Sequence, residues 1–151
     1  MRQKLQYLVI HCTDTPAGRP ITSQMIRYWH TVERGWKQVG YTDMVHIDGR
    51  IERLAENNDD EWVDPWEITN GVKGVNAMSR HIVYVGGKGG DTRTTAQKGA
   101  MLAYIKEVIR QCPDVQVAGH YQFDRNKTCP SFDVPKWLIA CGIPTKNIYR
   151  P

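Results

Sequence analysis

The chain has 151 residues, of which 40% are hydrophobic and 24% are charged, as in ordinary globular proteins. This length fits one domain, residues 1–151, with a buried core. The formal net charge of +4 is spread along the chain, and no basic run indicates nucleic-acid binding. No segment approaches the roughly 18 apolar residues that span a bilayer.

The beginning of the chain and its cysteines indicate where the protein is made. The first ten residues lack the longer apolar region and small-residue cleavage site of a secretory signal. We therefore expect synthesis in the cytoplasm, no stable membrane insertion and a monomer. The four cysteines are too few and too irregularly spaced for a disulfide scaffold. Three of them, Cys12, Cys112 and Cys141, suit small buried hydrophobic positions, whereas Cys129 lies in a polar segment.

The first half of the chain predicts a buried strand, a helix and a hairpin. The apolar run 7–10 suits a central strand that is buried on both faces. Thr22 and Ser23 can cap a helix that runs to about Lys37, before Gly40. Segments 44–47 and 50–54 flank Asp48-Gly49, a strong hairpin signal. Residues 57–74 are expected to form a long loop.

The second half alternates strands with helices. Segment 81–85 is an apolar strand, and Thr94 with Gln97 predicts a capping box at the start of a helix that Pro113 ends. Segment 115–118 is a further strand, and Asp133 caps a last helix that reaches Ala140. This alternation predicts an α/β fold, with a mixed, mainly parallel central β-sheet flanked by helices.

Two histidines directly follow predicted strands, and a cysteine follows the second of them. His11 comes after the first strand, His120 after segment 115–119, and Cys129 nine positions later. Sites in α/β sheets collect beyond the carboxyl ends of strands. Two imidazoles and a thiolate suit zinc and leave its fourth position open for water. Spacing alone leaves two alternatives: hydrogen-bonded structural histidines, or a histidine–cysteine pair of base and nucleophile.

Several motifs together resemble the type 2 N-acetylmuramoyl-L-alanine amidases, the family of the phage lysozymes and the peptidoglycan recognition proteins. The similarity is greatest to the phage endolysin branch. It extends over nearly the whole chain and is carried by segments 8–15, 26–30, 35–41, 48–49, 83–87 and 119–133, the last containing Lys-Thr-Cys-Pro-Ser-Phe-Asp.

The resemblance implies an amidase-like fold and specific roles for individual residues. His11, His120 and Cys129 would bind one Zn²⁺ per chain. Tyr41 and Lys127 would be the catalytic groups that do not bind the metal. A lysine cation can stabilise an oxyanion, and a tyrosine hydroxyl can position water or relay a proton.

The remaining histidines are excluded from the site. The resemblance makes His30 structural. His46 is expected to point outward to solvent from a strand, and His81 to make a local hydrogen bond.

The chain departs from the family beside the site. Thr42-Asp43 replace the usual His-Phe, and Asn70 stands where many members have a histidine. The loop 57–70 is longer than in the bacteriophage T7 member and carries Trp62 and Trp66. With Asn70, these are candidate substrate-binding residues, since exposed tryptophans can stack on sugars. The alternative, that both tryptophans plug the base of the loop, is equally open.

The resemblance implies hydrolysis of the amide between N-acetylmuramic acid and L-alanine in peptidoglycan. The alternatives are a non-catalytic peptidoglycan-binding module and a metal-free thiol hydrolase using Cys129 and His120. We expect action on the cell wall after release by a partner that permeabilises the membrane, as for a phage endolysin. A cytoplasmic cell-wall recycling enzyme is the alternative.

Overall fold

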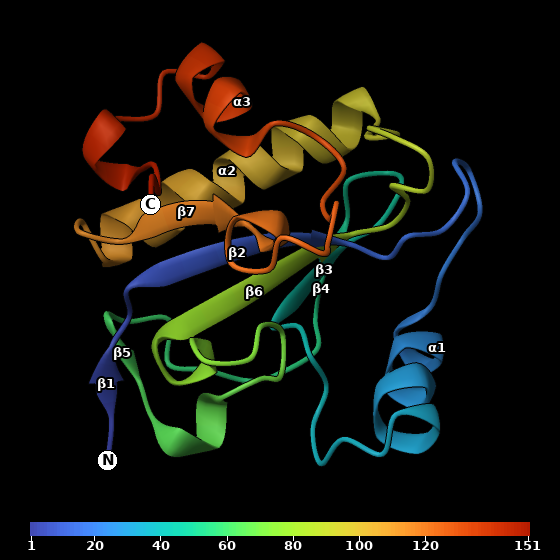
Figure 1. Cartoon of the computed structure of the whole chain (residues 1–151), viewed down its shortest axis with the longest axis horizontal. Coiled ribbons are helices and arrows are strands. Elements are labelled where there is room, and N and C mark those ends of the chain that lie inside the picture. The colour runs from blue at the N-terminus through green and yellow to red at the C-terminus, as the bar shows by residue number, and fades with distance from the viewer.

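A computed structural model describes all 151 residues and contains a central five-stranded sheet (Figure 1). The strand order is β4-β3-β6-β2-β7, and every adjacent pair is parallel except β3–β4. The strands are β2 (Tyr7–Cys12), β3 (Asp43–Val45), β4 (Ile51–Arg53), β6 (Ser79–Tyr84) and β7 (Gln116–Gly119). The predicted mixed, mainly parallel sheet flanked by helices is confirmed.

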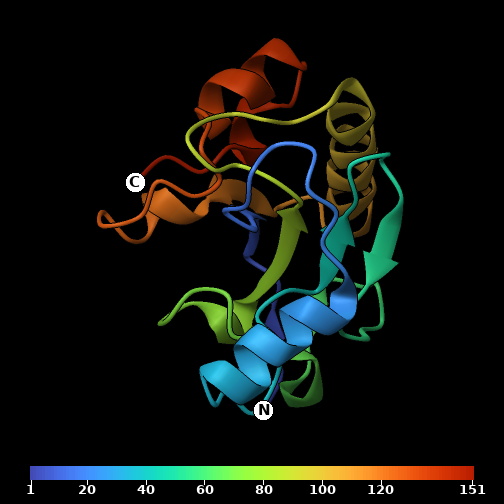
Figure 2. The same cartoon turned by 90° about the vertical axis from the view of Figure 1, so that its right-hand side faces the viewer.

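Helices cover both faces of this sheet (Figure 2). Helices α2 (Thr95–Gln111) and α3 (Val134–Ala140) pack on one face, where Ile10 and Ile82 meet Met101 and Ile105. Helix α1 (Ser23–Arg27) packs on the other face through a smaller cluster that contains Ile26, Met44 and Val83. Because side chains alternate along a strand, strands β3 and β6 contribute to both clusters.

The predicted N-terminal caps of helices α2 and α3 are confirmed. The Thr94 hydroxyl accepts from the Gln97 amide at 3.0 Å, and the Gln97 side chain accepts from the Thr94 amide at 2.9 Å. The Asp133 carboxylate accepts from the Lys136 amide at 3.0 Å and begins α3. The cap of α2 is therefore reciprocal and that of α3 is a single bond. Both satisfy amides that have no partner within the helix.

The first helix ends earlier than predicted. Thr22 caps α1 through the Met25 amide at 3.1 Å, but the helix widens into a π-helical turn, η1 (Tyr28–Glu33), and does not reach Lys37. Gly35 has a φ of +68°, a left-handed conformation that glycine adopts without strain and that stops the helix.

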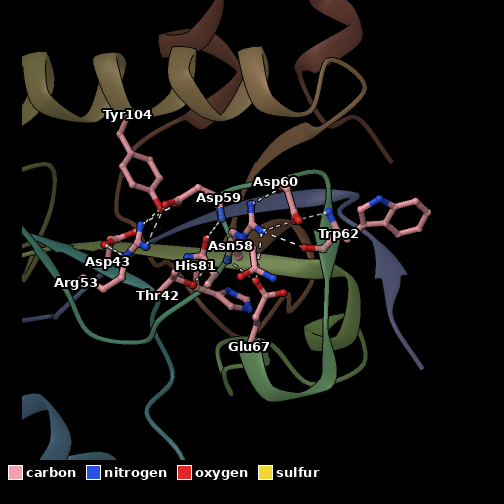
Figure 3. A network of polar contacts seen from close by, with 12 residues as sticks. Thr42, Asp43, Arg53, Asn58, Asp59, Asp60, Trp62, Glu67, His81 and Tyr104 are labelled. Carbon is pink, nitrogen blue, oxygen red and sulfur yellow. Dashed lines mark hydrogen bonds and ion pairs between the residues drawn. The ribbon is translucent and has the colours of Figure 1, made fainter.

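The segment predicted as a long loop contains short ordered elements. Strand β5 (Trp62–Val63) pairs antiparallel with β1 (Gln3–Lys4), and a 3₁₀ turn forms at η2 (Pro65–Glu67). A second 3₁₀ turn, η3 (Asn76–Met78), directly follows the segment. The buried Glu67 carboxylate accepts from the backbone amides of Asn58 and Asp64 at 2.7 and 2.6 Å (Figure 3). Buried Arg80 of β6 donates to the carbonyl of Trp62 at 3.0 Å and so ties this segment to the sheet.

Two further 3₁₀ turns, η4 (His120–Gln122) and η5 (Thr145–Asn147), complete the secondary structure.

The predicted hairpin is present, with Val45 opposite Ile51 and the Arg50 amide donating to Asp48 at 2.9 Å. At its base, Arg53 and Tyr104 converge on buried Asp43 (Figure 3), with the Tyr104 hydroxyl donating at 2.6 Å. No helix is long and apolar enough to cross a bilayer.

Candidate metal centre

The sequence indicated that His11 follows the first strand. In the structure, His11 lies inside strand β2. Its strand neighbours Ile10 and Cys12 belong to the core on the α2 side, so the alternation places the His11 imidazole on the opposite face. The residue is only 1% exposed. The site therefore forms on the face of the sheet near the strand end.

His120 reaches the same face from the adjacent strand. Gly119 at the end of β7 is paired with Ile10 of β2, so His120 begins η4 beside His11. The ring centroids of the two histidines are 4.8 Å apart. Parallel pairing of β2 and β7 thus brings together two side chains that are over a hundred positions apart in the sequence.

Cys129 is brought back to the strands by backbone hydrogen bonds. The Tyr121 amide donates to the Cys129 carbonyl at 2.9 Å, and the Cys12 amide donates to Cys129 Sγ at 3.1 Å. The hydroxyls of Tyr84 and Ser131 hold the following turn by donating to Pro130 O at 2.6 Å and Gly87 O at 2.8 Å.

The candidate ligand atoms of His11, His120 and Cys129 all lie within 4.8 Å of one another. Burial, then the positive charges that His81 and His120 would carry, lower the pKa of His11 well below its usual value. Burial, then the charge of Lys127, lower the pKa of His120. Both imidazoles are therefore neutral near pH 7 and have a lone pair to give.

The Cys129 thiol lies directly beside Cys12. The neighbouring Cys12 thiol, and then burial, raise the pKa of Cys129. A bound cation would reverse this preference, because ligand thiols bind metals as thiolates. The donor set of two neutral imidazoles and one thiol fits zinc, with three protein ligands and a fourth position open.

Tyr41 and Lys127, the two predicted catalytic residues, lie beside the candidate ligands. The Tyr41 ring centroid is 5.1 Å from that of His11, and burial raises the pKa of its hydroxyl, so the phenol stays protonated. Lys127 is exposed and lines two clefts that meet at the site.

The two clefts differ in their chemistry. The first, of about 700 Å³, is lined partly by main chain and small side chains, namely Asp14, Gly87, Gly89, Gly90, Thr128 and Ser131. The second, of about 470 Å³, contains His120 and Lys127 together with Arg34, Trp36, Asn70 and Lys73, and no carboxylate lines it. The predicted substrate residue Asn70 therefore lies beside two of the candidate site residues.

Trp62 and Trp66 are not brought to the site. Trp62 belongs to β5 and is paired with Lys4, and the Arg2 guanidinium lies 4.3 Å from its ring centroid. Trp66 is 60% exposed on η2. Neither tryptophan lines the two clefts described above. The half-buried Trp62 fits the alternative that it plugs the base of the loop, whereas the exposed Trp66 does not.

Two of the remaining histidines make contacts outside the site. His30 is buried, and its Nδ1 accepts from the Gly40 amide at 2.9 Å, which makes it structural as the resemblance implied. His46 is not turned out to solvent: its Nε2 lies 2.8 Å from Glu52 Oε1.

His81 and Cys12 are the site residues that sequence reasoning missed. The bond expected for His81 was local, but its Nδ1 lies 2.9 Å from His11 Nε2, across 70 positions of sequence. The parallel register opposes His81 to Val9, two residues before His11 and on the same face. Cys12 lies in the buried core, as predicted, and its main-chain amide also donates to Cys129 Sγ. The register reveals the first of these neighbours, and the fold of the Cys129 loop reveals the second.

Comparison with known proteins adds a family match. Residues 1–132 match the N-acetylmuramoyl-L-alanine amidase family. The endolysin of Enterobacteria phage K11 is 31% identical, with 97% of this chain and 93% of the endolysin covered. The endolysin of Klebsiella phage KP32 is 32% identical, with 90% and 87% covered.

Solved structures share the fold. The endolysin amidase LysCS from Clostridium intestinale superimposes with a TM-score of 0.75 at 21% identity, covering 93% of this chain and 86% of that protein. Drosophila peptidoglycan recognition protein LB gives a TM-score of 0.73 at 20% identity, covering 100% and 91%.

Proposed function

Since this chain belongs to the N-acetylmuramoyl-L-alanine amidase family and is a peptidoglycan amidase, we propose that it is zinc-dependent. Its substrate bond is the amide between N-acetylmuramic acid and the L-alanine of the stem peptide. Residues 1–151 act as one catalytic domain. Like the endolysins of its phage relatives, it acts on the cell wall.

The convergence of His11, His120 and Cys129 carries this proposal. These residues come from β2, from the turn after β7 and from the following loop, and local structure alone does not require them to meet. Zinc held by them would supply a Lewis acid for activating water and polarising the scissile carbonyl. Loss of Cys129 would be expected in a module that only binds peptidoglycan, and its presence supports catalysis.

Lys127 and Tyr41 supply groups that the metal ligands do not. The Lys127 ammonium, at the junction of the two clefts, stabilises the negative charge that develops on the carbonyl oxygen. The protonated Tyr41 phenol, packed beside His11, orients water or passes a proton through its hydroxyl. Neither group offers zinc a good ligand atom at neutral pH, so their work is in the chemical step.

The two clefts suit the two parts of peptidoglycan. Stem peptides carry carboxylates, and the cleft with Arg34, Lys73 and Lys127 offers three cations without a competing acid. The glycine-lined cleft leaves room for the bulkier sugar chain. A substrate laid across both clefts places its sugar–peptide amide at the junction, beside Lys127 and His120.

The decisive experiment identifies the broken bond. Purified peptidoglycan is digested and analysed by mass spectrometry, while the zinc content of the enzyme is measured by elemental analysis. We expect intact stem peptides with a free L-alanine amino group, uncut glycan chains and close to one zinc per chain. New reducing sugar ends would identify a glycosidase and contradict the proposal.

Two controls separate the zinc mechanism from a thiol hydrolase. Chelation should stop hydrolysis and zinc should restore it, whereas a Cys129–His120 thiol enzyme would continue without metal. Cys129→Ser should lose most of its zinc, since a hydroxyl is a poorer ligand than a thiolate. His46→Gln, a change at a histidine that contacts Glu52 away from the site, should keep both zinc and activity. Active wild-type protein without zinc would rule out the metal mechanism.

A further inference from the structure

We propose that His81 is a positioning residue that locks His11 in the tautomer whose Nδ1 is free to bind metal. The inference rests on the proposed zinc site. It adds a residue that offers the metal no ligand atom of its own but determines which nitrogen of His11 does.

The argument begins at a main-chain amide whose role is fixed. The Val72 N–H lies 2.8 Å from Asn76 Oδ1. A backbone N–H only donates, so the oxygen of the Asn76 amide must be the atom that faces it. The same oxygen lies 3.0 Å from His81 Nε2. Because an amide oxygen only accepts, His81 Nε2 must carry a proton.

The second step passes this constraint through His81. The residue is fully buried, and its two ring nitrogens face an amide oxygen and another imidazole, with no carboxylate to stabilise a positive charge, so this environment favours the neutral ring. A neutral imidazole with its proton on Nε2 has a lone pair on Nδ1. That Nδ1 lies 2.9 Å from His11 Nε2. His11 Nε2 must therefore be the donor.

The third step gives the consequence for the metal. With its proton held on Nε2, His11 can offer a lone pair only from Nδ1. Nδ1 is then the only nitrogen of His11 that can bind zinc. Ligand histidines usually donate their other N–H to a carboxylate or carbonyl. Here the acceptor is a second imidazole, which adds no negative charge to the site.

The surroundings hold the His81 ring in place. Its main-chain amide donates to the Thr42 hydroxyl at 3.1 Å, and Figure 3 shows the two residues side by side. On the other side, a Cβ at Gly71 would overlap the His81 imidazole, so the absence of a side chain there makes room for the ring. The relay Val72–Asn76–His81–His11 is thus built from fixed parts.

The test compares His81→Phe and His81→Gln with the wild type. Phenylalanine fills the space but leaves the His11 Nε2–H without an acceptor, and His11 is then free to move its proton to Nδ1. We expect zinc affinity, measured by competition with a chromogenic chelator, to fall by about 10- to 100-fold. Glutamine can accept from His11 and donate to Asn76, so it should recover most of the affinity. His46→Gln serves as the matched control and should bind zinc normally.

Nitrogen NMR of the histidine rings gives a readout independent of activity and of zinc. In the metal-free wild type, both His11 and His81 should be protonated at Nε2. In His81→Phe, His11 should lose this single tautomer. On zinc binding, the Nδ1 shift of His11 should move to a metal-bound value while that of His81 should not.

If His81→Phe does not fold, Asn76→Leu and Asn76→Asp test the same relay from its other end. Leucine removes the acceptor that holds the His81 proton on Nε2, and zinc affinity should fall. Aspartate accepts from both Val72 and His81 and should preserve it. The proposal is overturned by unchanged affinity in His81→Phe, by a proton on His11 Nδ1 in the wild type, or by direct coordination of His81. A wild type that binds no zinc would instead refute the proposed function. The nitrogen NMR spectra would still show which nitrogens of His11 and His81 are protonated, so the two failures can be told apart.

Discussion

At the scale of single residues, Lys127 and Tyr41 test the division between metal ligands and catalytic groups. The roles proposed for them are electrostatic and concern charge that appears only as water attacks the carbonyl. Removing one such preorganised donor typically costs about 100- to 1000-fold in rate. Lys127→Ala and Tyr41→Phe should therefore lose most of kcat while keeping wild-type zinc content and thermal stability.

A change at Lys73 provides the matched control for Lys127→Ala. Lys73 lines the cleft that contains Arg34 and Lys127, and it does not line the glycine-lined cleft. Lys73→Ala should raise KM more than it lowers kcat, because it removes binding and not chemistry. Steady-state kinetics on a soluble muropeptide separates the two effects. Near-normal kcat in Lys127→Ala or Tyr41→Phe would remove that residue from the mechanism, and loss of zinc would make it part of the metal site.

The buried His30 leads to a prediction of how the stability of the folded protein depends on pH. Its Nδ1 accepts from the Gly40 amide, and burial, followed by the charge of Arg34, lowers its pKa from 6.5 to about 4. Between these two values the unfolded chain binds more protons than the folded chain. Stability contributed by neutral His30 is therefore present above pH 6.5 and is lost as pH falls toward about 4.

His30→Asn keeps an acceptor near the position of Nδ1 but does not titrate. Between pH 6.5 and 4 the stability of the zinc-free variant should fall less than that of the zinc-free wild type, as measured by urea unfolding at several pH values. Parallel pH profiles for the two proteins would show that His30 titrates normally in the folded state.

The sequence motifs indicated the candidate metal ligands, but they did not indicate the residues that surround these ligands in the fold. His11, His120 and Cys129 are recognisable because they stand next to strands or in a characteristic segment. His81 carries no such signal, since its importance arises from the register that opposes it to Val9 of a strand distant in sequence. The position of Trp62 in a strand was unpredictable for a similar reason, because its pairing with Lys4 is also a long-range contact.

At the scale of elements, the cap of α2 links local sequence to tertiary structure. The Thr94 hydroxyl accepts from the Gln97 amide and donates to the Ile47 carbonyl at 2.8 Å, which joins the helix to the hairpin. Thr94→Ala should destabilise the protein by about 1–2 kcal/mol, toward the upper end of N-cap effects. Thr22→Ala, which removes a single cap bond on the short α1, should cost less.

Urea unfolding of both variants measures this difference. Equal losses would mean that the bond to Ile47 contributes nothing beyond capping. Both caps were predictable because capping depends on residues three positions apart. The early end of α1 and the strand β5 were not: the first follows from a wide turn before Gly35, and the second has only two residues and exists through its partner β1.

At the scale of the whole molecule, two cores share one sheet. The larger core lies under α2 and α3 and the smaller under α1, and strands β3 and β6 contribute to both. The overall architecture was predictable because buried strands and amphipathic helices alternate along the chain. His11 lies on the α1 face, whereas Cys129 packs against the larger core, and its loop is held there by the bonds from Tyr84 to Pro130 and from Ser131 to Gly87.

Because the cores share strands, neither can lose its structure without exposing the other. We therefore predict a single cooperative unfolding transition, seen at the same temperature by far-ultraviolet circular dichroism and tryptophan fluorescence.

The proposed zinc ion would join β2, η4 and the Cys129 loop, and the unfolded chain has no such preformed site. Binding should stabilise the folded state by about 2.7 kcal/mol at a free zinc concentration one hundred times the Kd. For a chain of this length each kcal/mol raises Tm by about 2–4 °C. Chelation should move the whole transition downward by the corresponding amount and leave it single, whereas Cys129→Ser should show little response to zinc. Two separate transitions, with zinc shifting only one, would mean that the two faces of the sheet unfold independently and that residues 1–151 do not behave as one domain.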